Sequence, residues 1–502
     1  MTQNPEFDLL MDGTESESTE SKIKVVTEDE LAAMEAECKL VIDEIAADNA
    51  MLETKEATPV GHAAQAIFSN MPMRVKTELD YLLGDLRRLY SDDIAQAVHA
   101  GLGVLGAMSL AGSDNCLVLI YEGPSGFGKS TVVRMLTPAA NTAHATNAVV
   151  DSHIVRIDKF TPASFVSNSS NRTAEQLSEI DLLPKLKHKT MVTKELAALF
   201  GDNEDGLRNT FGILTSVLDG NGYVTGSGAH GTRGYEGDFR FNWLGATTPI
   251  KQRVFDLMSQ CGNRLLLWEM QARDVPTAEL VADEDNDASV GKALGWATSQ
   301  LVSAHYRRFP ANSVDPASVL IPKRLKEQIA RYAKLLVAGR VSITKVAKPW
   351  EAEEFEVGDK EGPYRPFHLL KMLAKGLALV GERNYVNEDD VRIVRNVAIS
   401  TLPPTARKFL RLAAGGGVDA AQFAALEKCS LPTARTRMRM LDKTSLFEVT
   451  KGTNNAATTL RLRPDWEATM FPEGADRPEL EDYQEPRQFD GLASLKGRPL
   501  AS

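Results

Sequence analysis

The chain divides into segments with a regular spacing of apolar residues and segments without one. Residues 1–24 are rich in acidic residues, Ser, Thr and Asn and have no apolar period, which predicts a disordered acidic tail. From Thr27 the capping pattern "TEDE" leads into a helical apolar stripe, and we expect a helix there that docks or self-associates. A second helical pattern, "VKTELDYLLGDLRRLYSDDIAQAVHAGLGVLGAMSLAG", completes an N-terminal helical region at residues 25–110. The stripe consists of Leu31, Met34, Cys38, Leu40, Ile42 and Ile45.

Apolar runs of strand length follow this helical region. They are "CLVLIYEG", "HIVRID", "TMVTKEL", "FNWLGATTPI" and "CGNRLLLWEM". A helical segment, "LRNTFGILTSVLDG", and a Gly-rich hairpin, "NGYVTGSGAHGTRGYEGDFRF", lie between the third and fourth runs. The next long stretch, "EGPYRPFHLLKMLAKGLALVGERNYVNEDDVRIVRNVA", is helical in its pattern.

The C-terminal part has a different arrangement of apolar segments. Two helical patterns, the turn "CSLP", a third helical pattern and two β-type runs around "KGTNNA" follow one another. This layout is that of a winged helix-turn-helix, which we place at residues 403–466. Residues 467–502 are rich in Pro, Glu, Asp and Gly and predict a second disordered tail.

The composition argues against a membrane-spanning protein, a secreted protein and a cysteine-based metal site. With 43% hydrophobic residues the chain can form ordinary globular cores, and no apolar run approaches the roughly 18 residues that span a bilayer. The acidic N-terminus lacks the basic region of a signal peptide, so we expect a cytoplasmic protein without a membrane partner. The cysteines have no metal or redox spacing, and no metal site is expected from them. They are Cys38, Cys116, Cys261 and Cys429.

The segment "GPSGFGKS" matches the phosphate-loop pattern G-x-x-x-x-G-K-S/T between an apolar strand and a helical segment. Glycine lets backbone N–H groups turn toward phosphates, Lys129 would reach the β- and γ-phosphates, and Ser130 would ligate Mg²⁺. We therefore expect ATP and Mg²⁺ as ligands; the alternative is a Gly-rich turn before a helix. The predicted nucleotide-binding residues are Gly123, Pro124, Ser125, Gly126, Phe127, Gly128, Lys129, Ser130 and Thr131.

The order of these elements resembles the AAA+ superfamily, and within it the minichromosome-maintenance helicases and the primase-helicase proteins of phages and mobile elements. The resemblance covers roughly residues 117–400. It implies an α/β fold, with a P-loop AAA+ core containing a parallel sheet at residues 111–275 and an α-helical lid at residues 276–402. The C-terminal winged helix-turn-helix would follow this lid.

The resemblance also implies roles for single residues. Glu195 would activate the attacking water, and Thr248 or Thr247 would be the polar sensor beside the γ-phosphate. Arg264 would be an arginine finger that reaches a neighbouring subunit, and Arg365 would be the lid sensor that binds nucleotide. Taken without the resemblance, the arginines fit surface ion pairs and the threonines fit a strand end followed by a turn.

Two segments carry the predicted DNA contacts. His230 and Arg233 lie near the tip of the Gly-rich hairpin, which in helicase-like relatives contacts DNA in the central pore; the alternative is a solubilising loop. The third helix of the C-terminal part carries Arg435, Arg437 and Arg439, a basic island within a chain of net charge -11. A winged helix that contacts protein is the alternative for that part.

Lys194 departs from the family pattern, because relatives usually have an aspartate before the catalytic glutamate. A lysine there would repel a divalent cation. Lys194 could point away while Ser130 and waters suffice for the metal. Asp158, at the end of "HIVRID", could instead supply the metal-binding carboxylate. In the third interpretation the protein binds ATP and hydrolyses it slowly or not at all.

The combined prediction is a ring-forming homo-oligomeric ATPase that acts on DNA as a helicase-like motor, with ATP hydrolysed between subunits. The alternative is a nucleotide-gated DNA-binding or assembly switch with little turnover, such as a regulator or a component of a bacterial conflict system. A third hypothesis is a remodeller of protein partners that bind the N-terminal helix.

Overall fold

The computed structural model describes residues 77–112, 115–137, 148–167, 172–201, 203–227, 231–271, 287–346, 354–413, 417–450 and 458–466. All of them belong to one compact unit that begins at Lys76. The expected tails at residues 1–24 and 467–502 and the apolar helix after Thr27 lie outside the described residues, and so does His230. The domain ranges expected from the sequence therefore stay predictions.

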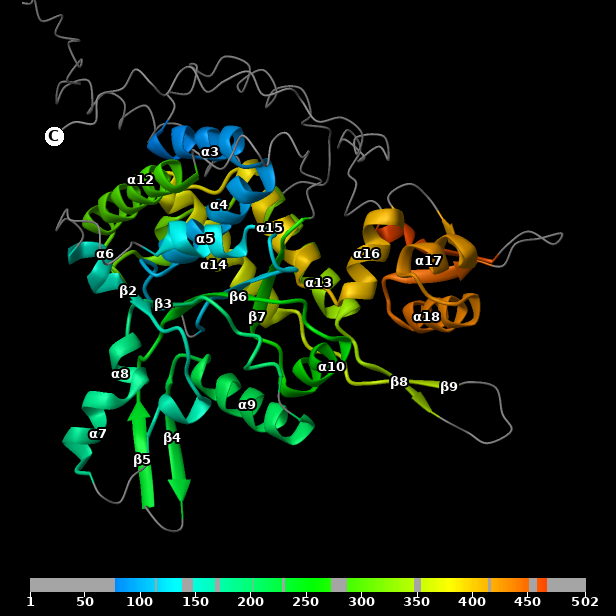
Figure 1. Cartoon of the computed structure of the whole chain (residues 1–502), viewed down its shortest axis with the longest axis horizontal. Helices are drawn as coiled ribbons and strands as arrows, with labels where there is room; N and C mark the ends of the chain where they lie inside the picture. The colour runs from blue at the N-terminus through cyan, green and yellow to red at the C-terminus, as the bar shows by residue number, and fades with distance from the viewer. Residues whose placement is uncertain are drawn as a thin grey trace, which may run out of the picture. The chain divides into compact units, whose positions relative to one another are not determined.

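Five parallel strands form the central sheet of the described chain (Figure 1). Their order is β2-β3-β6-β1-β7, so that β6 is inserted between β1 and β3. Because the strands are parallel, their carboxyl ends meet at one edge and their amino ends at the other. The predicted α/β fold with a parallel sheet is confirmed. The strands are β1 (Val118–Glu122), β2 (Ile154–Arg156), β3 (Thr190–Thr193), β6 (Asn242–Thr247) and β7 (Leu265–Glu269).

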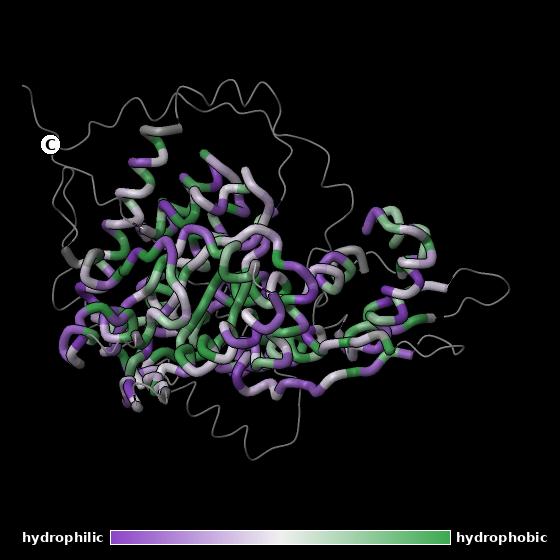
Figure 2. Tube along the Cα trace, turned by 60° about the horizontal axis from the view of Figure 1, so that its bottom comes forward, coloured by the Kyte–Doolittle hydropathy of each residue, from purple (hydrophilic) through white to green (hydrophobic). Residues whose placement is uncertain are grey.

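Helices cover both faces of this sheet, which explains why its strands are apolar on both sides. Leu119 and Tyr121 of β1 pack into one cluster, whereas Val118 and Ile120 face a second cluster. Figure 2 shows hydrophobic positions concentrated along the central strands. No helix in the described ranges is long and apolar enough to span a bilayer. The first cluster includes α3 (Glu78–Leu89), α4 (Asp92–Ala107), α5 (Lys129–Leu136), α6 (Ala148–His153), α12 (Asp287–Arg308), α13 (Lys323–Gly339), α14 (Tyr364–Val380) and α15 (Glu388–Ser400), and the second α8 (Leu182–Leu186), α9 (Glu204–Val217) and α10 (Gln252–Cys261).

Helix α4 is buried along nearly its whole length, because it contacts β1 and β6 of the sheet as well as α14. Side chains of the sheet donate to its backbone: the Tyr121 hydroxyl to the Ala97 carbonyl at 3.0 Å, and Asn242 Nδ2 to the Val104 carbonyl at 2.7 Å. Glycines let α4 and α14 approach closely. A Cβ at Gly376 would overlap the carbonyl oxygen of Gly103. The two backbones are therefore in direct contact where the helices cross.

Two hairpins extend from this core. β4 (Gly222–Ser227) and β5 (Gly231–Glu236) form the antiparallel hairpin that the Gly-rich segment predicts. Figure 1 shows it beside α7 (Ala174–Ile180) and α8, which belong to the segment between β2 and β3. The second hairpin consists of β8 (Ile343–Val346) and β9 (Glu354–Val357), between α13 and α14 in sequence. Short 3-10 turns occur at η1 (Pro162–Ser164) and η2 (Pro316–Ser318).

Residues 404–466 are here called the C-terminal module, and its described part contains helices and a small antiparallel sheet. The sheet has the order β10-β12-β11. Helix α18 lies against both β11 and β9. The segment 451–457 that joins β11 to β12 lies outside the described residues. The winged helix-turn-helix interpretation stays a prediction. The elements are α16 (Pro404–Ala413), β10 (Val418–Asp419), α17 (Ala420–Glu427), α18 (Leu431–Lys443), β11 (Phe447–Thr450) and β12 (Thr459–Leu462).

The α4–α14 crossing predicts an asymmetry between two Gly→Ala changes. Gly376→Ala should lower the free energy of unfolding by about 1–3 kcal/mol, because the new methyl group overlaps backbone that cannot yield. Gly212→Ala in exposed α9, where a Cβ meets no atom within 4 Å, should raise it by about 0.5–1 kcal/mol. Urea unfolding followed by circular dichroism measures both. Equal stability of Gly376→Ala and the parent protein would show that the two helices do not touch there.

Candidate functional site

The phosphate-loop segment connects β1 to α5 at the carboxyl edge of the sheet. Gly126 and Gly128 have φ angles of 85° and 81°, a left-handed conformation that favours glycine. A Cβ at Gly128 would also overlap Cδ1 of Ile94. The N–H of Gly123 donates to the carbonyl of Thr247 at 3.2 Å, which attaches the loop to β6. The loop conformation therefore depends on the glycines that define the sequence pattern.

Lys129, the first residue of α5, is directed into this loop. Its Nζ donates to the carbonyl oxygens of Gly123 at 2.5 Å and Pro124 at 2.6 Å, and only 7% of the residue is exposed. Burial lowers the pKa of Lys129, and the negative charge of Glu195 acts in the opposite direction. Ser130, next in the helix, is exposed. The loop thus holds a buried ammonium group within the electrostatic reach of a carboxylate.

Glu195 lies two residues after β3, a strand that is two positions from β1 in the sheet. The four residues of β3 are buried, and the chain reaches the surface at Lys194 and Glu195. Glu195 Oε1 accepts the N–H of Ala197 at 2.8 Å, so this carboxylate is held by its own loop. Lys194 is exposed, and the three interpretations of its effect on the metal stay predictions.

Asp158 is bound to another partner. Both of its carboxylate oxygens accept from Arg156, at 3.0 Å from Nε and 2.7 Å from Nη2. These hydrogen bonds lower the pKa of Asp158, and the charge of Lys194 adds to the effect. β2 is separated from β1 by β3 and β6, which corresponds to about 14 Å across the sheet. The structure therefore does not bring Asp158 together with Ser130, and the described ranges contain no group of three His, Cys, Asp or Glu residues suited to a metal ion.

The two threonines at the end of β6 differ in environment. Thr247 is fully buried, and its Oγ1 has no hydrogen-bond partner among the described residues. Thr248 is exposed in the loop that follows, at the same sheet edge as the phosphate loop. Only Thr248 can contact a bound ligand without rearrangement of the strand.

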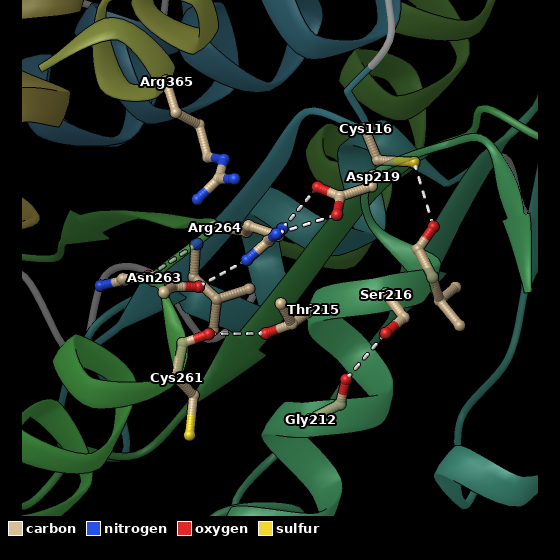
Figure 3. A network of polar contacts seen from close by, with 12 residues as sticks. Cys116, Gly212, Thr215, Ser216, Asp219, Cys261, Asn263, Arg264 and Arg365 are labelled. Carbon is tan, nitrogen blue, oxygen red and sulfur yellow. Dashed lines mark hydrogen bonds and ion pairs between the residues drawn. The ribbon is translucent and has the colours of Figure 1, made fainter. Parts of the chain in front are cut away.

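Arg264 lies at the opposite, amino edge, immediately before β7. Since Leu265 is in register with Val118, about 16 Å of strand separates Arg264 from the phosphate loop. Its Nε and Nη2 donate to Asp219 at 2.8 and 2.9 Å, as Figure 3 shows, and only 7% of the residue is exposed. This ion pair, in which the Asp219 side chain is 39% exposed, fits the salt-bridging alternative that the sequence left open for Arg264.

Arg365 lies near Arg264 (Figure 3). A Cβ placed on Gly262 would be 3.1 Å from Nη1 of Arg264 and 3.6 Å from Nη1 of Arg365. The side chain of Arg365 is 36% exposed, and its Nη1 is 3.9 Å from Glu361 Oε1. Burial raises the pKa of Glu361, whereas Arg340, Arg365 and Arg264 lower it. Three arginines thus surround one carboxylate at the amino edge.

Arg233 of β5 is directed into the protein, not toward solvent. Its guanidinium lies 2.6 Å from Oδ2 of Asp181, which is fully buried, and donates to the Ser167 carbonyl at 2.5 Å. The Tyr235 hydroxyl donates to the same carboxylate at 2.7 Å. These bonds join the β4–β5 hairpin to the α7–α8 segment. A phosphate would have to compete with Asp181 for Arg233.

The three arginines of α18 have different surroundings. Arg435 is exposed. Arg437 Nη1 pairs with Glu427 at 2.7 Å, and the guanidinium of Arg439 lies 6.0 Å from the ring centre of Phe355 in β9. The β8–β9 hairpin therefore covers part of the helix predicted to bind DNA.

Three charged residues that sequence reasoning missed meet at the carboxyl edge: Glu122, Glu269 and Arg407. Nη2 of Arg407 is 2.6 Å from Glu122 Oε2, and its Nε is 3.3 Å from Glu269 Oε1. Burial raises the pKa of Glu122, and the charge of Arg407 opposes this. The one sequence signal of this cluster is Glu122, a charged residue at the end of the apolar run before Gly123. The sequence around Arg407 has no comparable signal.

The sheet, the glycine loop and the flanking helices define an α/β protein whose architecture is consistent with a P-loop fold. No protein-family model matches the chain, and no curated protein matches it. Among solved structures that match is a full-length MCM homolog from Methanopyrus kandleri, with a TM-score of 0.35 and 10% sequence identity. The match covers 69% of this chain and 63% of that one. This chain thus spans less than two thirds of the matched protein.

The Arg233–Asp181 pair predicts a stability effect. Arg233→Met should lower the free energy of unfolding by about 3–5 kcal/mol, because it leaves the Asp181 carboxylate buried without its cation. Arg435→Met, the same change at an exposed position, should alter it by less than about 0.5 kcal/mol. Urea unfolding compares the two variants. Similar small effects for both would mean that the ion pair does not hold the hairpin.

Proposed function

We propose that this chain is an ATPase of the AAA+ type that assembles into an oligomer and acts on nucleic acid. The observation that carries the proposal is a phosphate-loop lysine and a carboxylate at the same edge of a parallel sheet. Lys129 follows β1, Glu195 follows β3, and the charge of Glu195 acts on the pKa of Lys129. Phosphoryl transfer to water needs cationic contacts to the phosphates and a group that orients the water. These residues fit the two roles.

The loop fits ATP with Mg²⁺. Gly126 and Gly128 leave the backbone N–H groups uncovered, and Lys129 can exchange its two carbonyl partners for phosphate oxygens. Ser130 is exposed as a ligand for Mg²⁺, which keeps several waters in most protein sites. When bound, Mg²⁺ neutralises charge on the β- and γ-phosphates. Glu195 orients a water and accepts its proton.

In this proposal the sensor and the two arginines act on nucleotides bound to different subunits. Thr248 serves as the sensor from the carboxyl edge of the same chain. Arg264 and Arg365 lie at the amino edge, too far to reach the phosphate loop of their own chain. In a ring they would serve the nucleotide of the next subunit, Arg365 from a partly exposed position and Arg264 by exchanging Asp219 for phosphate.

Nucleic acid would bind the C-terminal module, acting as a winged helix-turn-helix. Arg435 is exposed on α18 for a phosphate contact, whereas Arg437 and Arg439 would first leave Glu427 and Phe355. Within the hairpin, the engagement of Arg233 with Asp181 leaves His230 as the proposed DNA contact.

ATP hydrolysis measured across protein concentration, with and without single-stranded and double-stranded DNA, tests the enzyme. Turnover should rise with assembly and with DNA. Lys129→Ala should abolish it by preventing phosphate binding, and Glu195→Gln should lower it by about 100-fold or more while nucleotide still binds. Glu204→Gln, at an exposed position in α9, is the matched control and should leave turnover unchanged.

Mixed assemblies test the division between subunits. Lys129→Ala and Arg264→Ala chains should each be inactive alone. Together they should regain part of the activity, because some interfaces then combine an intact loop with an intact arginine. Absence of any recovery, with mixing verified, would contradict action across an interface.

A nucleotide-gated switch is the second candidate, and the exposed Lys194 in place of the usual aspartate favours it. In that case ATP sets assembly or DNA binding and turnover is incidental. Tight ATP binding without hydrolysis under any condition would support the switch and remove the motor.

The DNA-binding proposal makes a salt-dependent prediction. Arg435→Ala should weaken binding of duplex DNA and reduce the slope of log affinity against log salt by about one, because one phosphate contact is lost. Arg392→Ala, at an exposed position of α15, should change neither. Fluorescence anisotropy at several salt concentrations measures both. An unchanged slope for Arg435→Ala would exclude its contact with phosphate.

A further inference from the structure

Arg407 connects the C-terminal module to the strand end from which the phosphate loop starts. Arg407, in the first helix of the module, is 3% exposed on its side chain and extends to the carboxyl edge of the sheet. Its guanidinium contacts Glu122 and Glu269, the last residues of the neighbouring strands β1 and β7. Its Nη1 also donates to the carbonyl of Ser400 at 2.6 Å. The guanidinium is therefore held by a hydrogen bond through Nη1 and by ion pairs through Nη2 and Nε, and Nε has no hydrogen-bond partner among the described residues.

Glu122 is connected to both loops of the proposed nucleotide site. Its peptide is joined directly to Gly123, the first residue of the phosphate loop. Its Oε1 accepts the N–H of Ile250 at 2.7 Å, just after the loop that carries Thr248. Glu122 thus connects the start of the phosphate loop to the end of the loop that carries Thr248. Its second carboxylate oxygen pairs with Arg407.

Because these ion pairs are largely buried, the position of Arg407 affects the positions of Glu122 and Glu269. Only 1% of the Glu122 side chain is exposed, so water cannot replace the guanidinium there; 19% of the Glu269 side chain is exposed. Loss of one partner from a buried ion pair leaves the other charged group without compensation, and the surrounding backbone must move to rehydrate it. A displacement of α16 therefore has to displace Glu122, and with it the two loops.

We propose that Arg407 is a positioning residue through which the C-terminal module sets the geometry of the nucleotide site. The consequence for the proposed function, on which this inference rests, is that nucleic acid bound to the module alters nucleotide affinity. Nucleotide alters nucleic-acid affinity by the same factor, since such coupling is reciprocal. Arg407 touches no reacting atom in this role.

Arg407→Met and Arg383→Met, in the full-length chain, form the test. Arg383 makes a comparable buried pair with Asp390, at 2.7 and 2.8 Å, but this partner lies in the first turn of α15. Two quantities are measured for each variant: hydrogen exchange of the backbone amides at residues 123–129 and 247–250, and the Kd for ADP with and without duplex DNA. Global stability is measured by urea unfolding. Arg407→Lys, which cannot bridge both carboxylates, gives an intermediate case.

Arg407→Met should accelerate exchange in both loops by about tenfold relative to the rest of the sheet, raise the ADP Kd by about tenfold and remove the effect of DNA on it. Arg383→Met should lose similar global stability without these local changes. If Arg407→Met does not fold, Glu122→Gln replaces it, because the amide oxygen still accepts from Ile250 while the charge is gone.

The outcomes separate the inference from the proposed function. Equal exchange in the two loops for Arg407→Met and Arg383→Met would overturn the positioning role, even if ADP binds. If the unaltered protein binds no ADP, the proposed function fails, and the exchange data alone still decide whether Arg407 holds the loops.

Discussion

The close contact between α4 and α14 is the constraint on which the rest of the fold depends. α4 lies on β1 and β6, beneath α14, and its backbone accepts hydrogen bonds from Tyr121 and Asn242 of the sheet. Because Gly103 and Gly376 allow backbone contact, the sheet, α4 and the long helices after residue 287 form a single packed body. Ile94, at the start of the same helix, touches Gly128 of the phosphate loop, so this packing also limits the position of the loop.

The charged residues of the candidate site lie at two opposite edges of the sheet. Lys129 and Glu195 lie at the carboxyl edge, as in other parallel sheets whose ligands bind beyond the strand ends. The arginine cluster around Glu361 lies at the amino edge. In the proposed assembly, the groups at the carboxyl edge of one copy and the arginines at the amino edge of the next would form one site.

The sequence carries the elements that depend on local pattern. The glycine spacing of the loop, the apolar strands and the Gly-rich hairpin were all predictable, because each follows from backbone conformation or burial within a few residues. Ion pairs between distant segments were not. Arg233 with Asp181, Arg264 with Asp219, and Arg407 with Glu122 join residues 45 or more positions apart, and no periodicity encodes such partners. The same reason explains Asp158: the sequence shows that it follows a strand, but the strand order that separates it from β1 is a property of the whole sheet.

The two hydrogen bonds of Lys129 to its own loop have a consequence for the entropy of ligand binding. The ammonium joins the carbonyls of Gly123 and Pro124, so the loop keeps its curvature without a bound anion. In the proposed function, an entering phosphate would replace these carbonyls as the acceptor of the ammonium and would not have to order a free segment. Little conformational freedom is lost in that exchange, and more of the contact energy is retained as affinity.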